Sequence, residues 1–285
     1  MTQASEPGGA PPRGELIRDE TGRARLKFGD VHFETVFQPF FRVAGDKLRP
    51  DFATARIRPQ GEATPAGVLA RLAEGPGLSQ AAGLARCNLA FLDPETLCFC
   101  EDHQGSASMA QAALDLLLGA ARDAFMMADQ LVWRLPLSIA GEAAATIAAA
   151  RESGIRISLR MSSGDDPGLS VAKAAECRAD MLHLGVEWSG AWLENVPEAR
   201  TLLRSLVERM RQAGCGVSMT GISTAAQLDV ALDAGVTWLQ GGYLAPAVPA
   251  GRATGWQDLS ATALRRPGAN ITVLKQRQTP RHQQY

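Results

Sequence analysis

The chain has 285 residues, of which 46% are hydrophobic and 21% charged, and its formal net charge at pH 7 is −1. This length and composition suit one large α/β domain or two small ones, and the near-neutral charge excludes a general attraction to nucleic acid or to an anionic membrane. No apolar run is long enough to span a bilayer and the N-terminus lacks a basic-then-apolar signal pattern, so we expect a cytoplasmic protein.

The two ends of the chain differ in composition from the middle. Residues 1–26 are rich in Pro, Gly and charge, which predicts a flexible leader. Residues 255–285 turn basic and lose their apolar periodicity, which predicts a flexible tail. We therefore assign a single domain to residues 27–254. The five cysteines, an odd number, argue against a disulfide framework.

The middle of the chain alternates short apolar runs with helical patterns. A Gly-Asp turn joins the first two runs and predicts an antiparallel pair, whereas helical segments separate the later runs and predict parallel strands. This pattern predicts a TIM-type (β/α)8 barrel with an antiparallel first strand, and a doubly wound open sheet is the alternative. The predicted strands are His32–Val43, Leu48–Ile57, Thr96–Glu101, Leu131–Leu135, Ile155–Leu159, Met181–Leu184, Gly216–Thr220 and Thr237–Gln240. The main predicted helices are Ser108–Ala128, Gly141–Glu152, Pro197–Ala213 and Thr224–Ala234.

Several short motifs follow one another along these elements. Phe37–Phe40 reads FQPF, Phe52–Ala55 reads FATA, Gly216–Thr224 reads GVSMTGIST, and Gln240 precedes a Gly. In order and spacing these motifs resemble the EAL domain, a barrel family of phosphodiesterases that act on cyclic di-GMP. They are similar to the family's Tyr-Gln-Pro-Ile, its name-giving Glu-Ala-Leu, its Ala-Glu-Gly-Val-Glu-Thr and its closing Gln-Gly.

The chemistry of that family uses two divalent cations, which carboxylates and an amide hold. Of the family's ligand residues, this alignment retains only the amide, Gln240. Two ligand positions hold Arg, and a guanidinium repels Mg²⁺. The resemblance therefore implies a degenerate domain with no metal, no cofactor and no catalytic residue. The family's functional positions fall here on Ala53, Arg134, Arg160, Met161, His183, Thr220 and Gln240.

Binding a nucleotide needs fewer residues than cleaving it. By family position Arg134 and Arg160 lie at strand ends that face the barrel mouth, where two guanidinium groups can clamp a phosphate. Salt bridges that stabilise an emptied cavity are the alternative for this pair. Gln38, His183 and Gln240 complete the candidate ligand-binding set.

The strand that carries the name motif also contains arginines. Side chains alternate between the two faces of a strand, so Ala53, Ala55 and Ile57 are expected on the site face. Arg56 and Arg58 are then expected to point away from the site.

Two aspartates follow the strand that ends at Arg160. Asp165 and Asp166 are either displaced metal ligands or a turn with an N-cap ahead of a helix that begins at Pro167. The adjacent Ser, Gly and Pro favour the turn and N-cap.

Three functions remain open. The preferred one is a bacterial, catalytically inactive EAL-like regulator that contacts an unidentified protein partner in cyclic di-GMP-related control of motility, the flagellum or biofilm. The second is a receptor that binds cyclic di-GMP without hydrolysis. The third is a barrel enzyme with diverged phosphodiesterase chemistry. The family's helix-mediated dimers make a homodimer compatible with each of them.

Overall fold

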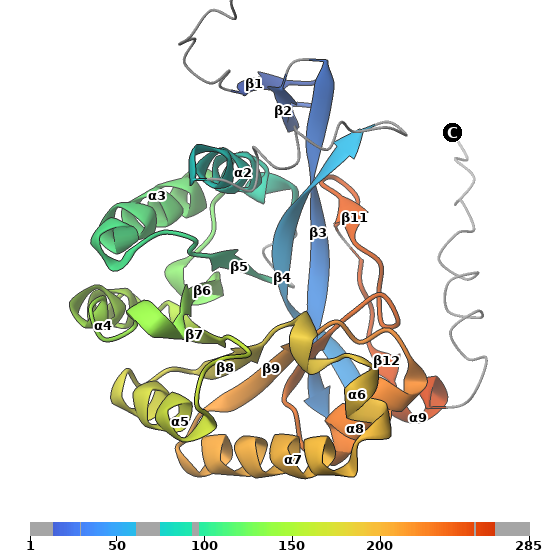
Figure 1. Ribbon diagram of the computed structural model, residues 1–285. Coiled ribbons are helices and arrows are strands. Elements are labelled where there is room, and N and C mark those ends of the chain that lie inside the picture. Colours follow the sequence, from blue (N-terminus) through green and yellow to red (C-terminus); the bar gives the residue numbers. More distant parts are fainter. Residues whose placement is uncertain (1–13, 29, 61–74, 93–96, 254, 266–285) are drawn as a thin grey trace, which may run out of the picture.

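Eight strands close into a barrel in the computed structural model, which describes residues 14–28, 30–60, 75–92, 97–253 and 255–265 (Figure 1). The strand order is β3-β10-β9-β8-β7-β6-β5-β4, and β4 pairs back onto β3. Strand β3 is antiparallel to both neighbours and the remaining pairs are parallel. The predicted barrel with an antiparallel first strand is confirmed, and the open sheet is excluded. The strands are β3 (Val31–Ala44), β4 (Lys47–Gln60), β5 (Cys98–Asp102), β6 (Leu131–Pro136), β7 (Arg156–Met161), β8 (Met181–Leu184), β9 (Gly216–Thr220) and β10 (Trp238–Gln240).

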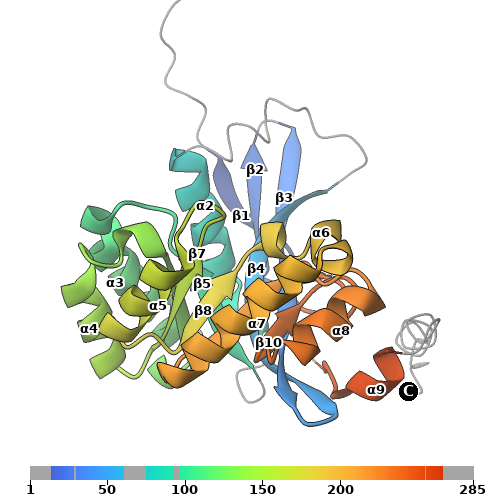
Figure 2. The same cartoon turned by 60° about the horizontal axis from the view of Figure 1, so that its bottom comes forward.

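Helices cover the outside of the barrel (Figures 1 and 2). Side chains cap three of the described helices: Asp166 accepts a hydrogen bond from the backbone N–H of Leu169 at 2.8 Å, Thr224 accepts one from Gln227 at 3.1 Å, and Ser260 accepts one from Ala263 at 3.1 Å. Asp165 accepts from the N–H of Ser162, so the two aspartates form the expected turn and N-cap. The helices are α2 (Gly75–Cys87), α3 (Ala110–Asp123), α4 (Ala144–Glu152), α5 (Pro167–Glu176), α6 (Ala191–Asn195), α7 (Pro197–Gln212) and α8 (Ala225–Asp233), with short 3-10 turns η1 (Leu89–Phe91), η2 (Ala107–Met109), η3 (Ala128–Gln130), η4 (Leu137–Ile139) and η5 (Val186–Trp188).

The apolar core has two main layers because most barrel strands are buried on both faces. The inner layer fills the barrel and includes the stacked rings of Phe40 and Phe52, whose centroids are 4.6 Å apart. The outer layer lies between the barrel and the helices and includes Phe37 and Phe99. All five cysteines are free, in keeping with the expectation of no disulfide framework.

Strands β1 (Glu15–Arg18) and β2 (Ala24–Phe28) extend the sheet from the start of β3. The expectation of a flexible leader is therefore wrong for residues 14–26, and residues 1–13 lie outside the described part. Buried Asn88 explains the order of this segment, because its side chain donates to the carbonyl of Ala24 and accepts from the N–H of the same residue. Leu26 packs beside it in a small core of its own.

The segment after the barrel is also folded, as far as residue 265. Strand β11 (Val248–Pro249) pairs with β3, and β12 (Leu259–Ser260) pairs with the start of β4. Helix α9 (Ala261–Leu264) follows, and Arg265 forms ion pairs with Asp229 and Asp233 on α8. The expectation of a flexible tail is wrong for residues 255–265, which include β12 and α9. Residues 266–285 lie outside the described part.

Candidate functional site at the barrel mouth

The parallel strands end together on one side of the barrel, and their inward-facing polar side chains meet there. We call this set the mouth cluster. Its members are Thr54 and Arg56 on β4, Asp102 on β5, Arg134 on β6, Arg160 on β7, His183 on β8, Thr220 on β9 and Gln240 on β10.

Arg134 lies at the centre of this cluster with 3% of its side chain exposed. Its guanidinium forms an ion pair with Asp102 at 3.3 Å and lies 5.3 Å from the centroid of the Phe40 ring. Burial lowers the pKa of Arg134, but the negative charge of Asp102 and its hydrogen bond more than offset burial, so the pKa is raised and the group stays charged. Its Nη2 atom has no hydrogen-bond partner among the described residues.

Asp102 joins two arginines. Besides its pair with Arg134, it lies 3.7 Å from the guanidinium of Arg160, whose side chain is 29% exposed. A single carboxylate thus compensates two guanidinium groups, while Arg56, also exposed, adds a third positive charge to the mouth cluster. Across the described residues, no group of three or more His, Cys, Asp or Glu side chains is arranged to hold a metal ion.

Gln240 organises the neutral side of the mouth cluster. Its Nε2 atom donates to the hydroxyl of Thr54 at 2.8 Å and to the backbone carbonyl of Gln38 at 3.0 Å. Its Oε1 atom accepts from the hydroxyl of Thr220 at 2.8 Å and from the guanidinium of Arg56 at 3.4 Å. The nitrogen and the oxygen of this buried amide are therefore both hydrogen-bonded to other groups of the protein.

His183 is buried next to these groups, and its Nδ1 atom lies 3.1 Å from the hydroxyl of Ser218. Burial and the positive charges of Arg134, Arg160 and Arg56 hold the pKa of His183 well below its usual value. The imidazole is therefore neutral at pH 7, and it adds no charge to the cluster.

The structure brings four of the five predicted site residues into the mouth cluster. Arg134, Arg160, His183 and Gln240 all face the mouth. Gln38 contacts the cluster through its backbone carbonyl, while its side chain donates to the carbonyl of Ala245 at 3.0 Å and holds the loop after β10.

The expected orientation of β4 is wrong by one residue. Ala53 belongs to the outer core layer, and Thr54 points into the barrel, where it contacts Gln240. With this parity Arg56 also faces the mouth, contrary to the expectation that it points away. Arg58, whose side chain is 48% exposed, forms an ion pair with Glu34 on β3.

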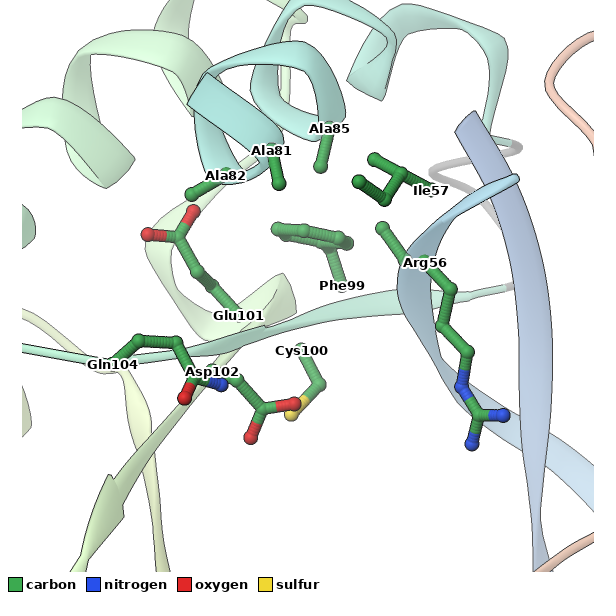
Figure 3. Close-up of a pocket in the computed structure, with 11 residues that line it drawn as sticks. Arg56, Ile57, Ala81, Ala82, Ala85, Phe99, Cys100, Glu101, Asp102 and Gln104 are labelled. Carbon is green, nitrogen blue, oxygen red and sulfur yellow. The ribbon is translucent and has the colours of Figure 1, made fainter. Parts of the chain in front are cut away.

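Two adjacent acids on β5 were not assigned from sequence. Asp102 faces the mouth, whereas Glu101 faces α2 and forms an ion pair with Arg86 at 2.7 Å. Cys98 and Cys100 pack in the barrel interior. Because side chains alternate between the two faces of a strand, Asp102 lies on the same inner face (Figure 3), and this spacing is the sequence signal that could have identified it.

Comparisons with known proteins agree with the barrel. Residues 23–247 match the model of the EAL domain. No curated protein sequence matches the chain. Among the described residues, no helix is both long and apolar enough to cross a membrane.

Solved structures share the fold at low sequence identity. The EAL enzyme Bd1971, bound to cAMP and cyclic di-GMP, has a TM-score of 0.64 and 14% identity over 77% of this chain, which spans 63% of Bd1971. The PaMucR phosphodiesterase in complex with cyclic di-GMP has a TM-score of 0.64 and 16% identity, covering 78% of this chain and 94% of that one. The FimX EAL domain from Pseudomonas aeruginosa, bound to cyclic di-GMP, has a TM-score of 0.62 and 17% identity, covering 78% and 93%. The family match covers most of the chain and the barrel agrees with it, so this chain belongs to the EAL domain family.

Proposed function

We propose that this EAL domain does not hydrolyse cyclic di-GMP and acts as a regulator by binding. The observation that carries the proposal is the charge of the mouth cluster, where Arg56, Arg134 and Arg160 face the single carboxylate of Asp102. A pair of divalent cations needs several oxygen ligands and a negative surrounding. The positive mouth cluster repels such ions, so the residues present do not fit a two-metal centre.

A hydrolysis assay tests this proposal. Purified protein is incubated with cyclic di-GMP and either Mg²⁺ or Mn²⁺, and the linear dinucleotide is followed by chromatography. We expect no product above that of a protein-free control. Metal-dependent hydrolysis that His183→Ala or Asp102→Asn abolishes would instead support the diverged enzyme.

Contact with a protein partner is the regulatory mode that we favour. Apolar side chains are exposed along η5, α6 and α7, where the fold itself does not bury them. This segment follows β8, which ends at the barrel mouth. The exposed residues are Val186 at 62%, Trp192 at 36%, Val196 at 39% and Leu202 at 43%. A variant with Val186→Ser and Leu202→Ser should fold normally but lose regulatory activity in cells, and retention of that activity would argue against this surface.

Binding of cyclic di-GMP without cleavage is the second candidate, and the uncompensated charge of the mouth favours it. The side chains of Arg56 and Arg160 retain exposed surface at the mouth. A guanidinium group can donate two parallel hydrogen bonds to the oxygens of one phosphate. Calorimetric titration with cyclic di-GMP in EDTA tests it directly. We expect metal-independent binding that Arg160→Gln weakens about tenfold, the loss of one charge-assisted contact. The exposed Arg211→Gln is the matched control.

A further inference from the structure

Large apolar side chains are exposed along α3, the helix between α2 and α4 on the outside of the barrel (Figure 1). Met109 directly precedes the helix and is 54% exposed, and Leu116 on its second turn is 58% exposed. Phe125 and Met127 follow its last turn and are 92% and 69% exposed. Four of the ten large hydrophobic side chains that are exposed in the described part of the chain therefore belong to this one helix and its two ends.

The spacing of the apolar residues gives α3 an outer stripe. Residues three, four and seven positions apart share one face of a helix. The α3 stripe consists of Met109, Ala112, Ala113, Leu116 and Ala120. The opposite face packs on the barrel through Leu114, Leu117 and Ala121. The α3 stripe is mostly alanine, which lets the backbone of a second helix approach closely, and it ends at the charged Asp123.

Phe125 ends α3 in a strained conformation. Its φ angle is 57°, its N–H donates to the carbonyl of Arg122 at 3.0 Å, and the N–H of Met126 donates to the carbonyl of Ala121 at 2.8 Å. Helices with this pair of bonds usually have Gly at the left-handed position, because a side chain there is strained. A bulky ring that is both strained and exposed does not stabilise the fold, so its benefit has to come from a contact outside the chain.

Opposite charges lie along one flank of the α3 stripe. Asp115 and Arg122 are exposed and seven residues apart, which is two helical turns. Asp115 accepts a hydrogen bond from Gln111 at 2.9 Å, and neither Asp115 nor Arg122 forms an ion pair within the described residues. If two such helices pack antiparallel, Asp115 of each faces Arg122 of the other, whereas a parallel pair brings like charges together. The flank is therefore complementary to itself in the antiparallel orientation alone.

We propose that α3 docks against α3 of a second copy of this chain, antiparallel and about a two-fold axis near Leu118 and Gly119. Such an interface uses the same surface twice, so each contact occurs in two symmetric copies. The reciprocal pairing of Asp115 with Arg122 is the reason to assign a second copy rather than a different protein.

The same register covers the exposed apolar side chains. It places Phe125 and Met127 of each copy beside Ala112 and Met109 of the other, and it brings Leu116 to the centre of the contact. Helices α3 and α6 lie apart in both views of the molecule (Figures 1 and 2). Self-association through α3 is therefore independent of the regulatory contact proposed for η5, α6 and α7.

Sedimentation velocity of the full chain over a concentration series tests the dimer. One helix pair is smaller than a standard interface, so we expect a reversible dimer with a dissociation constant of about 10 μM. Leu116→Glu should sediment as a monomer throughout the series. Leu169→Glu is the matched control, because Leu169 on α5 is also exposed, at 65%, and this variant should dimerise like the wild type. A wild type that remains a monomer at about 200 μM would overturn the proposal.

Exchanging the flanking charges tests the antiparallel register. Asp115→Arg and Arg122→Asp each bring like charges together at both symmetric positions, so each variant alone should dimerise at least tenfold more weakly. An equimolar mixture of the two should form a heterodimer, because Arg then meets Asp at both positions. The chain that carries both substitutions should regain the homodimer. Single variants that dimerise as tightly as the wild type would refute this register.

Phe125→Gly separates a binding role from a structural one. Gly adopts the left-handed conformation without strain, so the urea midpoint of the monomer at low concentration should rise. Loss of the ring should nevertheless weaken the dimer at least tenfold. If Phe125→Gly lowers the midpoint and dimerises like the wild type, the ring serves the fold and its place in the interface is refuted.

Discussion

Replacing Asp102 by Asn tests whether the mouth cluster is a coupled ion network. The substitution leaves the guanidinium of Arg134 charged and 97% inaccessible in the barrel, with Phe40 and Ser158 as its remaining neighbours. Removing one partner of a fully buried ion pair costs about 3–5 kcal/mol. The side chain of Asp102 is 30% exposed and Asn retains a carbonyl acceptor, so we expect a loss of about 2 kcal/mol in the free energy of unfolding.

Urea unfolding, followed by tryptophan fluorescence and circular dichroism, measures this loss as a lower midpoint with an unchanged slope. Adding Arg134→Met to Asp102→Asn removes the unpaired charge and keeps an apolar stem over Phe40, so it should restore most of the stability. Glu208→Gln on the surface is the control and should leave the midpoint unchanged. The reasoning is refuted if Asp102→Asn behaves like this control, or if the effects of the two mouth substitutions simply add.

Three further predictions concern neighbouring groups. Because the pKa of His183 is depressed in the folded state, the imidazole is protonated in the unfolded chain before it is protonated in the folded chain as the pH falls below about 6.5. The free energy of unfolding should therefore decrease on acidification, and it should decrease less in His183→Gln. Ring nitrogen chemical shifts in NMR should show a neutral imidazole at pH 6. The pKa of Glu101 is raised from 4.5 to about 7, so between these pH values the folded chain binds more protons than the unfolded chain. The free energy of unfolding of the wild type should therefore fall by at most about 3 kcal/mol as the pH rises from 4.5 to 7. Urea unfolding of Glu101→Gln over the same pH range should not show this loss. Gln240→Leu leaves the hydroxyls of Thr54 and Thr220 and the backbone carbonyl of Gln38 without their hydrogen-bond partner. It should lower the free energy of unfolding by about 3 kcal/mol or more. A urea midpoint close to that of the wild type would show that the amide network contributes little.

The barrel was predictable because its strands are distinct in the sequence. Short apolar runs bounded by Gly or Pro reproduce β8 and β9 to the residue, and most of the other strands to within a few residues. The antiparallel start followed from the turn after Ala44, since a short connection allows only a hairpin.

The faces of β4 were harder to assign, and the error there has a physical cause. Phe52 and Ala53 are both fully buried, one inside the barrel and one under the helices, so apolar character does not distinguish the two faces. A shift of one residue then reversed the orientation of every following side chain, including Arg56.

The folded N-terminal segment shows a second limit of local reasoning. Residues 14–28 carry few strong strand signals, yet Leu26 and Phe28 are buried against Leu84 on α2. The hydrogen bonds between Ala24 and Asn88 join residues 64 positions apart. Composition within a window of a few residues cannot reveal partners at that distance.

The placement of the two described ends has a practical consequence for how the protein is handled. Strands β1 and β2 attach to the part of β3 that faces Gln60, on the side where the parallel strands finish, whereas β12 joins the opposite pole, beside Leu48. A fluorophore or a biosensor tether introduced close to Arg265 would therefore leave the pole that carries the mouth cluster accessible. The same attachment near Gly14 would crowd it, and immobilisation through each end in turn would show whether a ligand or partner approaches from that pole.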